Sequence, residues 1–268
     1  LQELQKRYDF DLKIEFSEEV LRWMNRAHNA TEAHRILERL RKRDFSLTTD
    51  LIYALPEPYA DFWEEDLQIL LDYRPEHISA YTLTFEEKTA FYRQLERGKV
   101  SLPDDEKTSV QFLSLSNQLQ ATGYEHYEIS SFARNGLYAR HNTAYWFQKP
   151  YLGVGPSAHS YAGGRRWANV ASNFRYVQKV QARNLPNEEE VLSRNDQINE
   201  FVLTRLRTQW GLSLQELQKR YDFDLKIEFS EELLRVKEQT LIEERDQTLF
   251  LTPKGKLMAD EVAAIFFV

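Results

Sequence analysis

The apolar and polar residues of the chain follow a strand period in some segments and a helical period in others. Residues 45–56 (FSLTTDLIYALP) and 77–86 (HISAYTLTFE) are apolar runs of strand length. A helical pattern that begins at Asp61 separates them. Strand, helix and strand in this order predict two neighbouring parallel strands with a right-handed crossover, as in an α/β barrel or an open sheet.

The same periodicities predict further elements on both sides of this unit. Helices are expected to start at Ser17 and Thr31 and to cover 89–98, 104–122 and 174–183, with strands at 122–134 and 165–172. Acidic residues in the first turn and a following glycine support several of these helices. The segment NLPNEEEVLSRNDQ, with Pro186 and three consecutive glutamates, is predicted to separate a domain at 20–186 from one at 187–268.

The last eighty or so residues, from Ile198, have a different order of elements. A helix ends at Gly211, two more helices follow, and a hairpin is expected around residues 245–247 before LTPKGKLMADEV. Thr252 is expected to cap the final helix, with Pro253 at its first position. This order predicts a winged-helix-like α+β domain.

One segment occurs twice. Residues 1–19 (LQELQKRYDFDLKIEFSEE) are identical to residues 214–232. Ser213, with Glu216 three residues later, predicts a capping box for the second copy, whereas the first copy lacks this serine. We therefore interpret 1–19 as a transplanted duplicate. Its first nine residues should be less ordered than 214–222, and residues 11–16 are expected to pair beside 45–51.

Composition narrows the functional classes. The 268 residues are 42% hydrophobic and carry a net charge of −7, which argues against a general nucleic-acid binder. We find neither an apolar run long enough to span a membrane nor a signal peptide, so a cytoplasmic setting is expected. The chain contains no cysteine, which excludes disulfides, thiolate nucleophiles and the usual ligands of an iron–sulfur cluster.

Candidate chemistry is concentrated in residues 140–161, RHNTAYWFQKPYLGVGPSAHSY. His141 and His159 bracket this stretch, and Tyr145 and Trp146 lie between them. Aromatic rings with a polar group are typical of walls that hold a planar ligand. A loop that is packed by its own aromatic residues is the structural alternative.

The motifs HNxxYW and YLGxGPxAHS in this stretch resemble those of the heme chaperone HemW family. DLIY at residue 50 and NRAHN at residue 25 also resemble this family. The family belongs to the radical S-adenosylmethionine (SAM) proteins related to oxygen-independent coproporphyrinogen III oxidase. The resemblance runs from Phe16 to the C-terminus and implies an α/β fold. It implies a partial radical SAM (β/α) barrel with a family-specific extension, followed by the winged-helix-like domain.

The family's cofactors would be a 4Fe–4S cluster, SAM and heme. The resemblance places SAM contacts at Arg26 and Asp50, for which a salt bridge at the barrel rim is the alternative. The chain departs from the family at Ile14 and Glu15, where glutamine and serine are expected, and at Ala54, where glycine is usual. A CxxxCxxC loop has no counterpart here, so we expect no cluster, no metal ligands for one and no catalytic residue.

Heme is the other ligand that the resemblance implies. His141 and His159 are the candidate ligands and Tyr145 and Trp146 the candidate walls, although a structural role for both histidines stays open. We therefore expect a HemW-like protein that binds heme and transfers it to a client protein. Coproporphyrinogen III oxidation and nucleic-acid binding by the winged-helix-like domain are the alternatives.

Overall fold

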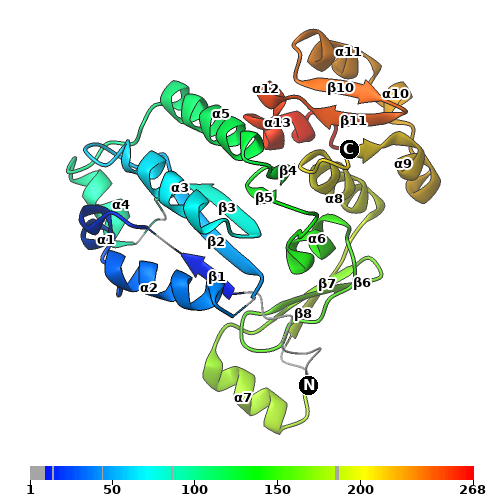
Figure 1. The fold of residues 1–268 in the computed structure, drawn as a ribbon. Coiled ribbons are helices and arrows are strands. Elements are labelled where there is room, and N and C mark those ends of the chain that lie inside the picture. Colours follow the sequence, from blue (N-terminus) through cyan, green and yellow to red (C-terminus); the bar gives the residue numbers. More distant parts are fainter. Residues whose placement is uncertain (1–9, 14, 44, 86, 88, 185–186) are drawn as a thin grey trace. The chain divides into compact units, whose positions relative to one another are not determined.

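The computed structural model describes residues 10–13, 15–43, 45–85, 87, 89–184 and 187–268 (Figure 1). The chain forms two compact units, a first unit that ends at Ala139 and a second unit that begins at Arg140. The division into domains at residues 186 and 187 stays a prediction. The α/β class is confirmed: parallel strands and helices alternate in the first unit, and a winged-helix order of elements closes the second.

Among the described residues, the sheet of the first unit has five strands in the order β1-β2-β3-β5-β4. These are β1 (Phe10–Lys13), β2 (Leu47–Tyr53), β3 (His77–Thr82), β5 (Ser131–Ala133) and β4 (Glu125–Glu128). Strands β2 and β3 are parallel neighbours with α3 (Phe62–Tyr73) between them in the chain. The predicted strand–helix–strand unit is therefore confirmed.

Helices cover this sheet with the apolar faces that the sequence predicts. Leu67 and Leu70 of α3 are fully buried, as are Leu115 and Leu119 of α5 (Asp105–Ala121). The other helices of the unit are α1 (Glu18–Trp23), α2 (Ala30–Arg41) and α4 (Ala90–Glu96). Helix α2 begins at Ala30 rather than Thr31 because Asn29 forms a capping box with Glu32. Asp61 occupies the N-cap position of α3, but its side chain makes no capping hydrogen bond.

The prediction of one strand at 122–134 is wrong, because this segment forms two strands of a hairpin. Strands β4 and β5 pair antiparallel, and β5 also pairs antiparallel with β3. The Glu128 carboxylate accepts hydrogen bonds from Ser130 N–H at 3.1 Å and from Ser131 Oγ at 2.8 Å. These two bonds stabilise the tight reversal, for which the sequence offers no glycine or proline.

Ala54, where the family usually has glycine, adopts an unfavourable backbone conformation. Ala54 follows β2 with φ of 55°, in the left-handed region that favours glycine. Gln111 Oε1 accepts a hydrogen bond from Ala54 N–H at 3.0 Å and holds the residue in this conformation. A side chain in this region costs about 1 kcal/mol relative to glycine.

The duplicated segment adopts two different structures. In the first copy β1 pairs parallel with β2, which confirms the expected pairing, although the strand covers Phe10–Lys13 rather than residues 11–16. In the second copy the same four residue types are Phe223 to Lys226, where Asp224 caps the helix α10 (Leu225–Glu228). The expected difference in order between 1–9 and 214–222 concerns residues 1–9, which lie outside the described part.

The second unit begins with α6 (Arg140–Trp146) and a three-stranded antiparallel sheet among the described residues. Its strands are β6 (His159–Ala162), β7 (Arg165–Asn169) and β8 (Asn187–Val191), with α7 (Asn173–Gln181) between β7 and β8 in the chain. The expected strand at 165–172 and helix at 174–183 are found with slightly different ends. The sequence left open a packed loop over residues 140–161. Its first part, residues 140–146, is instead a helix, although Tyr145 and Tyr151 do pack against each other.

The rest of the second unit follows the winged-helix order. It comprises α8 (Arg194–Leu206), β9 (Leu212–Ser213), α9 (Leu214–Tyr221), α10, α11 (Ser230–Glu238), β10 (Ile242–Arg245), β11 (Thr248–Leu251), α12 (Pro253–Lys256) and α13 (Ala259–Ala264). Thr252 caps a helix that begins at Pro253, as predicted, but this helix is the short α12 and not the final helix, because α13 follows it. Ser213 accepts a hydrogen bond from Glu216 N–H at 3.2 Å. The reciprocal half of the predicted capping box is not formed, because the Glu216 carboxylate binds Arg205 at 3.1 Å instead.

The chain segment before α1 is anchored to the first unit through a buried carboxyl group. Asp66 of α3 is buried, and its Oδ1 accepts a hydrogen bond from Phe16 N–H at 2.9 Å. Burial raises the pKa of Asp66 to about 7, and the hydrogen bond from Phe16 opposes this shift only in part. Because the folded state holds this proton more tightly than the unfolded state, stability should fall as the pH rises from about 4 to about 7.

An Asp66→Asn variant is expected to lose this pH dependence. The amide oxygen can still accept the bond from Phe16, but the side chain no longer ionises. Wild-type unfolding free energy should be lower at about pH 8 than at about pH 5 by a few kcal/mol, and the variant should show a much smaller difference. Urea unfolding at the two pH values measures this, and an equal pH dependence in both proteins would contradict the assignment.

Candidate functional site

The first unit holds a small hollow that contains both residues predicted to contact SAM. Arg26 lies just after α1, and Asp50 lies within β2 with 8% of its surface exposed. The hollow has a volume of about 250 Å³ and is lined by Met24, Arg26, Asp50, Ile52, Tyr81, Leu83 and Phe91. Because this is below the usual range of about 300–1,000 Å³, it has room for one end of a ligand rather than a whole cofactor.

The guanidinium of Arg26 is engaged by a carboxylate of the chain itself. Arg26 Nη2 lies 2.5 Å and Nε lies 3.1 Å from the two carboxylate oxygens of Glu15, whose surface is 2% exposed. This is the bidentate geometry with which arginine binds the carboxylate of a ligand. Glu15 is one of the positions at which the duplicate differs from the family motif. The ion pair at this rim therefore involves Glu15, a partner that the sequence interpretation missed although the acidic replacement was visible.

The second unit places two of the four heme candidates in direct contact. His141 and Tyr145 are one turn apart on α6, and Tyr145 Oη lies 2.9 Å from His141 Nε2. Their rings meet edge to face with centroids 4.7 Å apart. The row of rings continues from Tyr145 to Tyr151 at 4.5 Å and from Tyr151 to Tyr161 at 6.2 Å. Burial raises the pKa of Tyr151 and Tyr161, so both phenols stay neutral at physiological pH.

The other two candidates lie elsewhere in the second unit. Trp146 follows Tyr145 by one residue, which on a helix turns its side chain about 100° away. Its ring lies 5.7 Å from the guanidinium of Arg207. The indole Nε1–H is buried and has no hydrogen-bond partner among the described residues. His159 is exposed at the start of β6, and no ring contact or hydrogen bond joins it to His141 within the described part.

Strand alternation assigns His159 to one face of the three-stranded sheet. Side chains of His159 and Tyr161 share a face, while Ser160 and Ala162 point to the other. Trp167 lies directly opposite Ser160 in the register and therefore shares the second face. His159 thus lies on the same face as Tyr161, at the end of the row of rings that starts at His141.

A loop beside β6 is held by hydrogen bonds to its backbone. Gly153 N–H donates to Ser160 Oγ at 2.9 Å, and Gly155 N–H donates to Tyr176 Oη at 3.1 Å. Asn169 Nδ2 donates to the carbonyl oxygens of Gly153 at 3.3 Å and Gly155 at 2.9 Å. A Cβ atom on Gly153 would lie 2.2 Å from the carbonyl oxygen of His159, so this position requires glycine. The motif LGxGP therefore encodes a close approach of two backbone segments.

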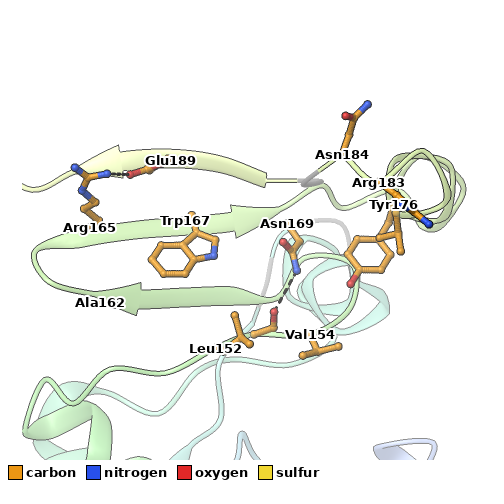
Figure 2. Close-up of a pocket in the computed structure, with 12 residues that line it drawn as sticks. Leu152, Val154, Ala162, Arg165, Trp167, Asn169, Tyr176, Arg183, Asn184 and Glu189 are labelled. Carbon is orange, nitrogen blue, oxygen red and sulfur yellow. Dashed lines mark hydrogen bonds and ion pairs between the residues drawn. The ribbon is translucent and has the colours of Figure 1, made fainter.

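This loop forms one wall of a larger hollow on the second face of the sheet. The hollow has a volume of about 710 Å³, and Figure 2 shows the Trp167 ring over the sheet, Leu152 and Val154 from the loop, and Tyr176 from α7. Its lining residues are Leu152, Gly153, Val154, Ala162, Arg165, Trp167, Asn169, Tyr176, Val180, Arg183, Asn184 and Glu189. The sequence interpretation missed this site, although Trp167 on a strand beside a helix with exposed apolar residues was a usable signal.

The residues present do not fit an iron–sulfur cluster. The sequence has no cysteine, and within the described part no group of three or more histidine, aspartate or glutamate side chains could hold a metal ion. A heme needs only one imidazole from the protein, and the imidazole of His141 is exposed. None of the helices described is long and apolar enough to cross a membrane.

Comparison with known proteins agrees with the architecture. A family model described as the HemN C-terminal domain matches residues 192–258. The chain is 30% identical over 253 residues to "Heme chaperone HemW" of Bacillus subtilis. The aligned segment covers 94% of this chain and 67% of that protein. It is 29% identical to the protein of the same name from Lactococcus lactis, with the same coverage. "Radical S-adenosyl methionine domain-containing protein 1, mitochondrial" of Danio rerio is 32% identical over 73% of this chain and 46% of its own length.

A solved structure has the same fold. Coproporphyrinogen III oxidase (HemN) from Escherichia coli, described as a radical SAM enzyme, superposes with a TM-score of 0.77 at 21% sequence identity. The superposition covers 97% of this chain and 64% of that one. At this identity the likeness establishes the fold alone. Together with the identity to the Bacillus protein over two thirds of its length, these findings place the chain in the heme chaperone HemW family.

Proposed function

We propose that the chain binds heme in the manner of a HemW chaperone and delivers it to a client protein. The observation that carries the proposal is the His141–Tyr145 pair on α6, an exposed imidazole whose Nε2 is within hydrogen-bond distance of a tyrosine hydroxyl. The name of the Bacillus relative, heme chaperone, supports the choice of ligand. We propose the cytoplasm as its compartment.

The pairing with Tyr145 gives His141 the arrangement that metal-binding histidines favour. When Nε2 carries the ring proton, it donates to Tyr145 Oη, and the lone pair of Nδ1 is left for iron. The tyrosine thereby holds the imidazole in one tautomer and one orientation. The row of rings from Tyr145 to Tyr161 offers an apolar wall beside it. His159, exposed on the same face as Tyr161, is the proposed second imidazole.

Neither alternative function has comparable support. Coproporphyrinogen III oxidation, as a radical SAM reaction, depends on a cluster for which this chain supplies no thiolate. Nucleic-acid binding depends mainly on cations that meet phosphates, whereas the net charge is −7. We propose heme and a heme-receiving client as the partners, and no catalytic residue in this chain.

Hemin titration tests the proposal. Binding to the wild-type chain should shift the Soret band of hemin, and the His141→Ala variant should bind hemin more weakly. Tyr145→Phe removes the orienting hydroxyl and should lower affinity by about tenfold. His159→Ala tests the second imidazole, and His28→Ala in the first unit is the control that should match the wild type. Identical spectra and affinities for the wild type and for the variants at His141 and His159 would return both histidines to structural roles.

A second experiment tests the expected lack of radical chemistry. After anaerobic reconstitution with iron and sulfide, the chain should hold no stoichiometric cluster and should release no 5′-deoxyadenosine from SAM, because no thiolate is present to ligate iron. Iron and sulfide analysis with product chromatography measures both. A brown protein that contains a stoichiometric cluster and cleaves SAM would contradict the assignment.

The hollow at Arg26 and Asp50 is proposed as the remaining part of a SAM site. In this site Glu15 forms an ion pair with Arg26, the arginine that would otherwise bind the carboxylate of SAM. Glu15→Ser, which restores the residue expected in the family, should free Arg26 for the carboxylate of SAM. SAM should then raise the unfolding temperature of this variant by a few degrees and leave the wild type unchanged. Glu19→Ser, an exposed change on α1, is the matched control. An equal shift in the wild type would contradict the blocking role of Glu15.

A further inference from the structure

The hollow on the second face of the sheet displays apolar side chains that the fold does not bury. Leu152 and Val154 are 75% and 82% exposed. Their loop is nevertheless held by four hydrogen bonds, from Gly153, Gly155 and the Asn169 amide. A fixed backbone that presents apolar groups to water is the arrangement of a preformed binding surface.

The floor of the hollow is flat and aromatic. Figure 2 shows the Trp167 indole lying over the strands, with Tyr176 at the end towards α7. The Tyr176 hydroxyl already accepts the hydrogen bond from Gly155 N–H, so this ring is held in place. The volume of about 710 Å³ is within the range of about 300–1,000 Å³ that small-molecule sites occupy.

The rim of the hollow is cationic. Arg183, just beyond α7, has a guanidinium with no ion-pair or hydrogen-bond partner in the part of the chain that the structure describes. Arg165 is paired with Glu189 at 3.0 Å, and both side chains are about half exposed, so this arginine is already matched by a carboxylate of the chain. The planar guanidinium of arginine matches a carboxylate. The lining residues include neither histidine nor methionine, and therefore no usual iron ligand apart from the tethered Tyr176.

We infer that this hollow is a second tetrapyrrole site, which binds the flat macrocycle on Trp167 and a carboxylate at Arg183 without ligating the iron. The inference rests on the proposed function, because heme is the flat, apolar dicarboxylate that the family handles. The site lies on the face of the sheet opposite to His159, so it is distinct from the histidine site. A tetrapyrrole held here has its metal unligated by the protein, in contrast to heme bound at His141.

Metal-free protoporphyrin IX is the probe, because it cannot bind through an iron ligand. Its fluorescence anisotropy should rise on binding to the wild-type chain, and its dimethyl ester, which lacks both charges, should bind more weakly. Arg183→Gln should weaken binding by about five- to tenfold, the effect of losing one charge-assisted hydrogen bond. Leu152→Glu, an exposed change at the mouth, should weaken it through like-charge repulsion. Arg175→Gln removes an exposed charge from the same helix outside the hollow and should change nothing.

His141→Ala separates this inference from the proposed function. It should weaken the hemin-dependent Soret shift and leave binding of metal-free protoporphyrin IX unchanged. A wild type that binds the metal-free porphyrin without a Soret shift from hemin would overturn the histidine site alone. No binding of the metal-free porphyrin, equal binding by wild type, Arg183→Gln and Leu152→Glu, or its loss in His141→Ala would overturn the second site. Circular dichroism confirms that each variant is folded.

Discussion

The close approach of Gly153 to β6 is the constraint on which both candidate surfaces of the second unit depend. A Cβ atom at this position would meet the carbonyl oxygen of His159 at 2.2 Å, a distance that real side chains do not reach. Because glycine is present, the loop lies against the strand and its N–H donates to Ser160. This contact fixes the start of β6, where His159 is exposed. It also fixes the wall that Leu152 and Val154 form beside Trp167.

The duplicated segment shows how far tertiary contacts decide local structure. Phe10 to Lys13 and Phe223 to Lys226 have the same residues, yet the first copy is a parallel strand beside β2 and the second begins the helix α10. Asp224 caps that helix through Lys226 and Ile227 N–H, while the first copy completes a sheet edge next to Leu47. Phe16 N–H, six residues after Phe10, donates to the buried Asp66. The first copy is therefore tied to α3 by a contact that the second copy does not make.

Much of the fold could be predicted because apolar runs such as those at Leu51 and Ile78 leave a chain few arrangements other than buried parallel strands. Helix starts followed from capping residues such as Thr252. The hairpin at Glu128 could not be predicted, because it depends on side-chain bonds of one glutamate rather than on glycine or proline. In the sites, no helix was predicted at residues 140–146, so the contact of His141 with Tyr145 was not foreseen. The Arg26–Glu15 pair and the hollow at Trp167 depend on chain segments that only folding brings together.

A crystal structure of the chain grown with hemin tests the central claim, that a family member without thiolates retains a histidine site for heme. We expect electron density for iron at the imidazole of His141, bound through Nδ1, with Tyr145 Oη still hydrogen-bonded to Nε2. An anomalous difference map at the iron edge identifies the metal independently of the porphyrin. Iron bound to side chains other than His141 and His159, or an empty α6 surface in crystals that contain hemin elsewhere, would contradict it.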